Sequence, residues 1–482
     1  MKHKNHPQQK TYDIAIIGAG SGGLTMAAVS AQLGYKVVLL EGGKMGGDCL
    51  NYGCVPSKAL IAAAKKAYVI NNSKAFGVTA DAKVDMAGVH NHIRKTIAAI
   101  APHDSQERFE GLGVDVIREY GFFINENTLG TESGRRLKAR RIIIATGSRP
   151  MVPNIKGLEA AGYQTNETVF DLKKRPEHLL IAGGGPIGTE MAQAFARLGS
   201  RVTLIEGAAQ ILSQEDLDVA KAVRERLESE SVEIITGYML SQVSKKEGTY
   251  SLTLSKNGQI KKVQGTDLLL ALGRQPNTEK LELENAGIEL DGRTIKVDRS
   301  LRTTSNNIFA VGDVAGPYQF THMSGFQAAY VIKRVLFGAF WAKIKYNAVP
   351  WVTYTDPEVA TVGLNETAAR NKYASKVKIT KTNFTENDRA QAEGQTYGFI
   401  KLVTRKGKLL GVTICGPRAG ELIGIWTLAL GKKLKPSAIS GMIHPYPTLN
   451  DISRQVVSDY YKPTFLSRKV RVLSKVMFRL FG

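Results

Sequence analysis

Cys49 and Cys54 are separated by four residues and are two of only three cysteines in the 482-residue chain. A disulfide between them would close a short loop, so it could stabilise the fold only slightly by restricting the unfolded chain. In a reducing compartment a bridge of this kind is usually transient and catalytic. The pair therefore indicates redox chemistry at sulfur. The alternative is that both are small buried hydrophobic side chains, as expected for Cys415 in its strand-like run.

A helix is predicted to begin at Cys54 and to continue through residues 58–64. The dipole and the free backbone N–H groups at a helix N-terminus lower the pKa of a thiol that lies there. Cys54 is therefore expected to ionise more readily than an ordinary cysteine.

The segment before the cysteines has the pattern of a dinucleotide-binding site. Residues 13–17 form an apolar run typical of a buried parallel strand, and a glycine-rich turn and a helix follow. Gly18, Gly20 and Gly23 allow a tight turn, close approach of the backbone to a pyrophosphate, and close packing of helix on strand. Glu41, at the end of the next predicted strand, is placed to accept ribose hydroxyls.

The same unit recurs later in the chain. An apolar run leads into Gly183, Gly185 and Gly188, a helix follows, and Glu206 ends the next predicted strand. Two dinucleotide sites indicate one bound cofactor and one that exchanges. A carboxylate at the position of Glu206 favours a free 2′-hydroxyl and repels a 2′-phosphate, so NADH is expected to be preferred over NADPH.

Length and composition indicate a cytoplasmic α/β protein of about three domains. Hydrophobic residues make up 43% of the chain, and no apolar run reaches the roughly 20 residues needed to cross a bilayer. Residues 1–10 are polar and lack a secretory core, so a disordered leader is expected. Three cysteines also argue against a secreted disulfide scaffold.

The formal net charge of +22 favours anionic partners. No zinc-ligand spacing, RNA-binding aromatic signature or long Lys/Arg block is present, so nucleic acid is not expected as a partner.

Part of the charge lies in the C-terminal tail, where residues 460–482 contain six basic residues and no acidic one. A helix over residues 467–481 would be amphipathic. Its apolar side comprises Val470, Leu473, Val476, Met477, Leu480 and Phe481, and its basic side comprises Arg468, Arg471, Lys475 and Arg479. Such a helix suits an anionic membrane surface. Packing on the protein itself or on a partner subunit is the equally open alternative.

Taken together, these motifs resemble those of the FAD-dependent, class I pyridine nucleotide-disulfide oxidoreductases, which include dihydrolipoamide dehydrogenase, glutathione reductase and mercuric reductase. The resemblance covers residues 12–461. It rests on the two glycine-rich turns, the cysteine segment and residues 143–148, 271–277 and 308–313, all in the order of the family. Residues 47–52 and 190–199 are most similar to mercuric-reductase-like members.

The resemblance implies an α/β fold with two Rossmann-like dinucleotide-binding domains and a C-terminal α+β dimerisation domain. The expected parts are an FAD domain over residues 11–150 and 276–345, an NAD(P) domain over 151–275, an interface domain over 346–461 and the basic amphipathic tail over 462–482. The resemblance also implies a homodimer, in which each active site includes a C-terminal segment from the partner subunit.

In the interface domain, residues 349–362 and 398–413 are predicted to form strands of an antiparallel sheet. Residues 381–395 are polar and are predicted to form a loop.

Cofactor-binding roles follow from the resemblance, which implies one tightly bound FAD per subunit. The expected FAD-binding residues are Gly18, Gly20, Gly23, Glu41, Lys58, Thr146, Gly147, Gly312, Asp313 and Thr321, with Asp313 on the ribityl chain. The expected nicotinamide-nucleotide residues are Gly183, Gly185, Gly188, Glu206 and Gly273. No metal ligands are predicted.

Catalytic roles follow in the same way. Cys54 matches the cysteine that lies against the flavin ring, and Cys49 matches the interchange thiol that attacks substrate. Lys58 and Glu190 match a pair near the reactive nitrogen of the flavin, where a cation stabilises negative charge on the ring. The alternative is that both are ordinary helical charges.

The chain departs from the disulfide reductases near its C-terminus. Those enzymes have a His that acts as general acid/base and a Glu that orients it, whereas Tyr446 and Asp451 occupy these positions here. An unperturbed Tyr has a pKa near 10 and cannot exchange protons at pH 7 as a His with a pKa near 6.5 does. His444 is either a substitute base or a structural loop residue.

The expected function is transfer of electrons from NADH through flavin and the Cys49–Cys54 disulfide to a thiol/disulfide or thiophilic metal acceptor. Mercuric reductases also lack the His, but they carry a C-terminal cysteine pair, and this chain ends in Phe481 and Gly482. Two alternatives stay open. One is a dihydrolipoyl dehydrogenase that uses His444 as base, and the other is a membrane-associated flavoprotein electron carrier or interaction protein held by its tail.

Overall fold

The computed structural model describes residues 10–481, so nearly all of the predicted N-terminal leader lies outside the described residues. The chain forms two compact units. Unit 1 comprises Met1–Gly183, Ala194–Val202 and Met239–Lys345, and unit 2 comprises Gly184–Gln193, Thr203–Tyr238 and Tyr346–Gly482. This division differs from the predicted domain bounds, which stay a prediction.

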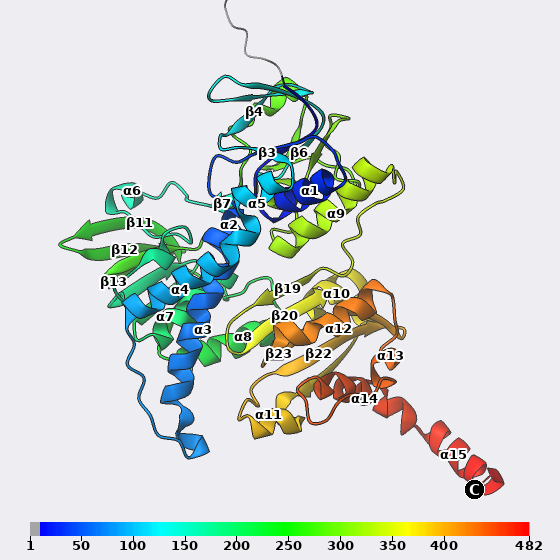
Figure 1. Ribbon diagram of the computed structural model, residues 1–482. Helices are drawn as coiled ribbons and strands as arrows, with labels where there is room; N and C mark the ends of the chain where they lie inside the picture. The colour runs from blue at the N-terminus through cyan, green and yellow to red at the C-terminus, as the bar shows by residue number, and fades with distance from the viewer. Residues whose placement is uncertain (1–9, 482) are drawn as a thin grey trace, which may run out of the picture. The chain divides into compact units, whose positions relative to one another are not determined.

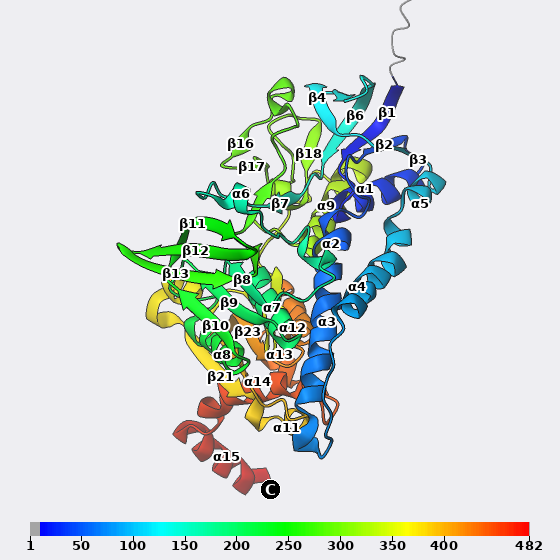
Figure 2. The same ribbon diagram turned by 90° about the vertical axis from the view of Figure 1, so that its left-hand side faces the viewer.

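A seven-stranded sheet forms the core of unit 1, with strand order β3-β2-β1-β6-β5-β4 and β18 paired with β6 (most strands are labelled in Figure 2). Its strands are β1 (Lys10–Ile17), β2 (Val37–Leu40), β3 (Val114–Ile117), β4 (Gly121–Asn125), β5 (Thr128–Thr131), β6 (Arg136–Ile144) and β18 (Ile308–Ala310). The central β1 runs parallel to both neighbours, with Ile16 opposite Leu39 on one side and Ile143 on the other. All three side chains are buried, as expected for a parallel sheet that is covered on both faces.

The helices of unit 1 are α1 (Ser21–Gln32), α2 (Gly47–Asn51), α3 (Cys54–Asn71), α4 (Met86–Ile100), α5 (Gln106–Gly111), α6 (Leu158–Ala161) and α9 (Thr321–Phe337). Helices α1 and α5 pack on this sheet, and α2 and α3 carry Cys49 and Cys54. Helices α1 and α9 lie side by side (Figures 1 and 2). Helix α3 begins at Cys54, so the predicted helix start is confirmed.

Smaller strand pairs complete unit 1. Antiparallel pairs join β7 (Ser148–Pro150) to β15 (Arg274–Pro276), and β16 (Leu290–Asp291) to β17 (Thr294–Ile295). Strand β8 (His178–Ala182) runs parallel to β14 (Asp267–Leu270), and β11 (Met239–Lys246), β12 (Thr249–Lys256) and β13 (Gln259–Gly265) form an antiparallel meander. Helix α7 (Pro186–Arg197) and β9 (Arg201–Glu206) contain residues of both units.

Unit 2 contains α8 (Leu217–Ser229), β10 (Val232–Thr236) and a five-stranded antiparallel sheet. The sheet has the order β19-β20-β23-β22-β21, formed by β19 (Pro350–Thr353), β20 (Glu358–Gly363), β21 (Lys378–Asn383), β22 (Phe399–Arg405) and β23 (Lys408–Gly416). Its helices are α10 (Glu366–Tyr373), α11 (Asp388–Ala392), α12 (Ala419–Gly431), α13 (Ser437–Ser440), α14 (Asp451–Phe465) and α15 (Arg468–Phe481). Buried side chains of the sheet, α12 and α14 form one core around Trp426.

The strands predicted within residues 349–362 and 398–413 are confirmed as β19, β20, β22 and β23. The prediction of a loop over residues 381–395 was wrong, because β21 extends to Asn383 and α11 covers Asp388–Ala392. Strand β21 is polar because it lies at the sheet edge, where most of its side chains are at least partly exposed. The mixed α/β class is confirmed.

Candidate active site

The two cysteines lie at the junction of two helices in unit 1. Cys49 is in the short α2, and Cys54 is the first residue of α3. Gly46 and Gly47 precede them with positive φ values of 85° and 60°. A Cβ on Gly47 would lie 2.9 Å from the Cα of Gly20, so this glycine lets the cysteine segment approach the first glycine-rich turn.

The two thiol groups are hydrogen-bonded to each other. Both cysteines are free in this structure, with Cys54 exposed and Cys49 half-buried. The Sγ of Cys54 also lies 3.3 Å from the hydroxyl Oγ1 of Thr321, the first residue of α9. The pair therefore has the proximity that reversible disulfide formation requires.

The environment separates the acidities of the two thiols. The hydrogen bond from Cys49 contributes most to lowering the pKa of Cys54 to about 6, burial opposes it, and Thr321 and the ammonium group of Lys58 lower it further. The pKa of Cys49 is raised, because Cys49 donates that hydrogen bond and is partly buried. Near neutral pH the reduced pair thus carries its negative charge on Cys54 and its proton on Cys49.

Asp48, next to Cys49, is held by groups from distant parts of unit 1. A guanidinium nitrogen of Arg274 lies 3.2 Å from its Oδ1, and the side-chain amide of Asn166 donates to the same oxygen at 3.2 Å. Asn166 also donates to the carbonyl of Tyr52 at 3.1 Å. These contacts fix the segment between the two cysteines.

The first glycine-rich turn has the shape of a phosphate cradle. Gly18 has φ of 104°, and a Cβ there would lie 2.4 Å from the carbonyl oxygen of Ala145. A Cβ on Gly23 would lie 1.9 Å from the carbonyl oxygen of Gly18, whereas one on Gly20 would meet no atom within 4 Å. The open space at Gly20, at the N-terminus of α1, suits a pyrophosphate. Glu41 accepts hydrogen bonds from the backbone N–H groups of Ala19 at 2.7 Å and Gly43 at 2.6 Å, so its carboxylate lies at the cradle.

Asp313 lies in a second polar cluster of unit 1. Its carboxylate accepts a hydrogen bond from the hydroxyl of Ser148 at 2.5 Å and lies 3.7 Å from Arg274. Burial raises its pKa, and Ser148 and Arg274 oppose that shift. The backbone N–H of Gly312 donates to the buried side chain of Gln327 at 2.6 Å. A partly buried carboxylate of this kind can accept the hydroxyl hydrogens of a sugar-like chain.

Thr146 and Gly147 are hydrogen-bonded to Asn277, whose backbone N–H donates to the carbonyl of Gly147 at 3.0 Å. The hydroxyl of Thr146 donates to the carbonyl of Asn277 at 2.8 Å, and the side chain of Asn277 donates back to the carbonyl of Thr146 at 2.9 Å. Together with the cradle and Asp313, these residues fit FAD.

The second glycine-rich turn repeats the geometry of the first. Within unit 1, Gly183 has φ of 111°, and its Cβ would lie 2.2 Å from the carbonyl oxygen of Ala271. Within unit 2, a Cβ on Gly185 would meet no atom within 4 Å, and Gly188 lies in the first turn of α7. The carboxylate of Glu206 accepts from the backbone N–H groups of Gly184 at 2.6 Å and Ala208 at 2.7 Å, as Glu41 does in the first site.

The remaining predicted residues of the nicotinamide and flavin sites lie in different units. Gly273, with φ of 114°, belongs to unit 1, and its carbonyl accepts from the backbone N–H of Met151 at 2.9 Å. Lys58 lies in α3 of unit 1. Glu190 is buried in unit 2, where its Oε1 accepts from the backbone N–H of Tyr354 at 2.8 Å. The pairing of Lys58 with Glu190 stays a prediction.

The C-terminal segment in unit 2 differs from the expectation. Tyr446 is 72% exposed, and its hydroxyl donates to Asp388 at 2.8 Å, which raises its pKa. The carboxylate of Asp451 is engaged by Arg454, one turn further along α14, at 2.7 and 2.9 Å. Asp388, and not Asp451, is therefore the acidic partner of Tyr446 within the chain.

The ring of His444 is half-buried, and its Nε2 lies 2.9 Å from the carbonyl oxygen of Ile439. This contact agrees with the interpretation of His444 as a structural loop residue. No contact within the chain supports His444 as a general base.

Comparison with known proteins agrees with this geometry. Residues 12–330 match the family described as pyridine nucleotide-disulphide oxidoreductase, and residues 349–456 match the dimerisation domain of the same family. The chain belongs to the pyridine nucleotide-disulphide oxidoreductase family. Members of this family are FAD-dependent and use NAD(P)H, and the dimerisation domain indicates a homodimer.

Several relatives align over nearly all of this oxidoreductase. A dihydrolipoyl dehydrogenase of Geobacillus stearothermophilus is 34% identical over 448 residues, which are 91% of this chain and 94% of the relative. A mercuric reductase of Bacillus cereus is 32% identical over 442 residues, which are 91% of this chain and 70% of the relative.

Among solved structures, the Cu(II) complex of the HOCl-induced flavoprotein disulfide reductase RclA from Escherichia coli is similar, with a TM-score of 0.84 and 29% identity. The similarity covers 93% of this chain and 99% of that one.

Sequence reasoning missed several residues of this oxidoreductase site. Gly46, Gly47, Ser148, Asn166 and Arg274 received no individual role, yet they position the cysteine segment or the buried Asp313. Two consecutive glycines, separated from Cys49 only by Asp48, were the available signal for the first two. For Asn166, which lies 118 residues from Asp48, the sequence offers no local signal.

Proposed function

We propose that this oxidoreductase passes electrons from NADH to a redox-active Cys49–Cys54 disulfide, and from there to a thiol/disulfide or thiophilic metal acceptor. One observation carries the proposal: the two sulfurs are hydrogen-bonded to each other beside the Thr321 hydroxyl and adjacent to a phosphate cradle. When bound, FAD supplies the two-electron chemistry that links the nicotinamide to the sulfurs.

The chain's own residues prepare the cysteine pair for this chemistry. Reduction breaks the S–S bond, and the pair gains two electrons and one proton, which together correspond to the hydride that NADH gives up. The proton is held by Cys49, and the charge is held by Cys54 with help from Thr321 and Lys58. Separation of charge and proton in this way stabilises the Cys54 thiolate, and Cys49 becomes a nucleophile only when it loses its proton.

The reduced cysteine pair transfers two electrons to a disulfide acceptor in two exchange steps. Cys49 loses its proton and attacks one acceptor sulfur, which forms a mixed disulfide and releases the other acceptor sulfur as a thiolate. The thiolate of Cys54 then attacks the sulfur of Cys49, which restores the Cys49–Cys54 bond and releases the second acceptor sulfur. The two electrons leave with the two acceptor sulfurs, one of which takes up the proton that Cys49 lost.

We infer a preference for NADH from Glu206. Its carboxylate lies at the second cradle, where a 2′-phosphate would bring a second negative charge close to it.

Three observations bear on the chemical class of the electron acceptor. The similar proteins include dihydrolipoyl dehydrogenases, a mercuric reductase and a reductase solved as a Cu(II) complex. The exposed Tyr446 in place of a histidine base speaks against efficient dihydrolipoamide turnover. Within residues 10–481 no cluster of three or more His, Cys, Asp or Glu side chains could hold a metal ion, so a soft metal acceptor would have to meet the cysteine pair itself.

The assay that tests this proposal measures NADH oxidation by purified holoenzyme with three acceptor classes: a small disulfide, Cu(II) or Hg(II), and a quinone. A parallel assay measures NAD+ reduction with dihydrolipoamide as the electron donor. Turnover with the first or second class, abolished in Cys49→Ser, supports the proposal. If the Cys49→Ser variant still reduces every acceptor, the proposal is contradicted, because electrons would then bypass the two sulfurs.

We also propose a cytoplasmic homodimer that contacts a membrane peripherally through its C-terminal tail. Among residues 10–481, no helix combines the length and apolar character that a bilayer crossing requires, so such a contact would be at the membrane surface.

A further inference from the structure

We propose that α15 is an in-plane anchor for a bilayer that contains anionic lipids. This inference deepens the peripheral contact proposed above by naming the residues and the lipid chemistry. It does not depend on electron transfer through Cys49 and Cys54.

None of the residues of α15 is buried. Seven large apolar side chains are between 47% and 80% exposed: Val472, Leu473, Val476, Met477, Phe478, Leu480 and Phe481. The alternative of a helix packed on its own chain is therefore not what the structure shows. A continuous apolar surface of this kind marks an interaction site.

Four of the five cations of α15 occupy a narrow arc of the helix, and the fifth, Lys469 in the first turn, falls among the apolar side chains. At 100° per residue, Arg468, Arg471, Lys475 and Arg479 fall within roughly 80° of the circumference, and the apolar side chains occupy more than half of it. No acidic residue occurs anywhere in residues 460–482. A surface with this charge is complementary to an anionic partner.

The width of the apolar arc favours lipid over a protein partner. A helix that packs against another helix buries a narrower stripe. In α15 the cations Arg471 and Arg479 adjoin Phe478 and Val472 at the two borders of the arc. Long basic side chains at these borders can reach lipid headgroups while the apolar side chains enter the acyl boundary.

The length and attachment of α15 favour a helix that lies on the membrane. Its 14 residues extend about 21 Å, which is shorter than the roughly 30 Å hydrocarbon core of a bilayer. Arg471 donates from Nε to the carbonyl of Leu466 at 2.7 Å, which ties the start of α15 to the end of α14. Within unit 2, α15 extends away from α14 and the sheet (Figures 1 and 2).

The test is flotation of the full-length holoenzyme with two kinds of vesicle: phosphatidylcholine alone, and phosphatidylcholine with about one-third phosphatidylglycerol. We expect flotation only with the anionic vesicles, and its loss at high salt. Arg471→Gln/Lys475→Gln is expected to lower the partition coefficient about 30-fold. Leu473→Gln/Met477→Gln is expected to lower it at least about tenfold.

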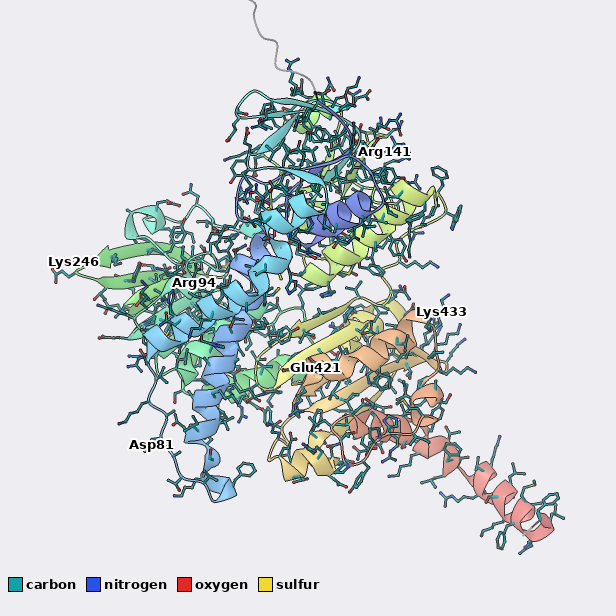
Figure 3. All side chains as sticks on the ribbon, in the orientation of Figure 1. Asp81, Arg94, Arg141, Lys246, Glu421 and Lys433 are labelled. Atoms are coloured by element: carbon teal, nitrogen blue, oxygen red, sulfur yellow. The ribbon has the colours of Figure 1, made fainter. Side chains whose placement is uncertain are left out.

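The matched control is Lys432→Gln/Lys433→Gln, which removes the same charge from an exposed position in unit 2 outside α15 (Figure 3). It should float like the wild type. NADH oxidation with a soluble acceptor should be equal in all four proteins, so failure of the proposed activity and failure of the anchor can be told apart.

Three results would overturn the inference. The first is wild-type protein that does not float with anionic vesicles. The second is an apolar variant that floats like the wild type while the charge variant does not, which would indicate electrostatic adsorption to the headgroups without insertion of the apolar side chains. The third is wild-type protein that does not float but forms assemblies larger than a dimer, when the Leu473→Gln/Met477→Gln variant does not form them. This result would indicate that α15 binds a second copy of the chain.

Discussion

At the scale of single residues, the chemistry depends on which of the two sulfurs carries the negative charge. The predicted helix start already favoured Cys54, and the structure adds donors that sequence spacing could not reveal. The hydroxyl of Thr321, 267 residues away, contacts the sulfur of Cys54, and the thiol of Cys49 donates a hydrogen bond to the same sulfur. Thr321 was expected only as an FAD-binding residue, because long-range contacts of this kind arise from packing of α9 near α3.

Thr321→Val is expected to raise the pKa of Cys54 by about one unit, because the thiolate loses a hydrogen-bond donor worth about 1 kcal/mol or slightly more. The measurement is the pH dependence of iodoacetamide alkylation of Cys54 in the reduced enzyme. Thr321→Ser is the control, since it retains the hydroxyl and should retain a pKa of about 6. Identical profiles for the Val variant and the wild type would exclude Thr321 as a donor.

Tyr446→His is expected to raise dihydrolipoamide turnover at least about tenfold, because a general acid/base with a pKa near neutrality contributes about 10²–10⁴-fold to such reactions. His444→Gln should leave the native turnover unchanged, since its ring is held by the carbonyl of Ile439. A large loss in His444→Gln, with no gain in Tyr446→His, would instead show a dihydrolipoyl dehydrogenase that uses His444.

At the scale of elements, periodicity and turn chemistry predicted most of what positions the site. The strand–turn–helix units at Gly18 and Gly183 could be predicted because only glycine tolerates their φ values and their close backbone contacts. The edge strand β21 and the short α11 could not, because their exposed polar side chains resemble those of a loop. Asp388, which α11 presents to Tyr446, was therefore missed.

Lys401 in β22 is only 1% exposed, and its ammonium group lies 3.1 Å from Asp216, 2.6 Å from Asp218 and 3.1 Å from Glu366. Lys401→Met should lower the free energy of unfolding at pH 7 by about 3 kcal/mol, because Asp216 would be left buried without its cation. Urea denaturation measures this change. Lys408→Met, an exposed neighbour, should change stability by less than about 0.5 kcal/mol.

The pH dependence of this difference follows from the pKa values of the carboxylates. Burial opposes ionisation of Asp216 and Asp218, but hydrogen bonds and the charge of Lys401 bring both pKa values below the usual 3.8. Carboxylates with lowered pKa values stabilise the fold above 3.8 and lose this contribution as the pH falls through their folded values. The difference in the free energy of unfolding between wild type and Lys401→Met should therefore become smaller below about pH 4. If this difference in the free energy of unfolding stays constant with pH, the charges of Asp216 and Asp218 do not cause it.

At the scale of the whole molecule, order of motifs along the chain sufficed to predict the family and its dimerisation domain. The electron acceptor was not predictable, because it is set by side chains such as Tyr446 that differ from the family pattern and by contacts that a partner subunit would supply. We expect light scattering of the holoenzyme to give twice the mass of the chain. A monomer with full activity would show that no segment from a partner subunit is needed.

The central claim is that NADH opens a bond between Cys49 and Cys54. The most direct measurement is alkylation with iodoacetamide under anaerobic conditions, before and after one equivalent of NADH, followed by peptide mass analysis. We expect both cysteines to be protected before NADH and both to become alkylated after it, while the buried Cys415 stays unmodified throughout. Equal alkylation of Cys49 and Cys54 with and without NADH in the oxidised holoenzyme would contradict the account.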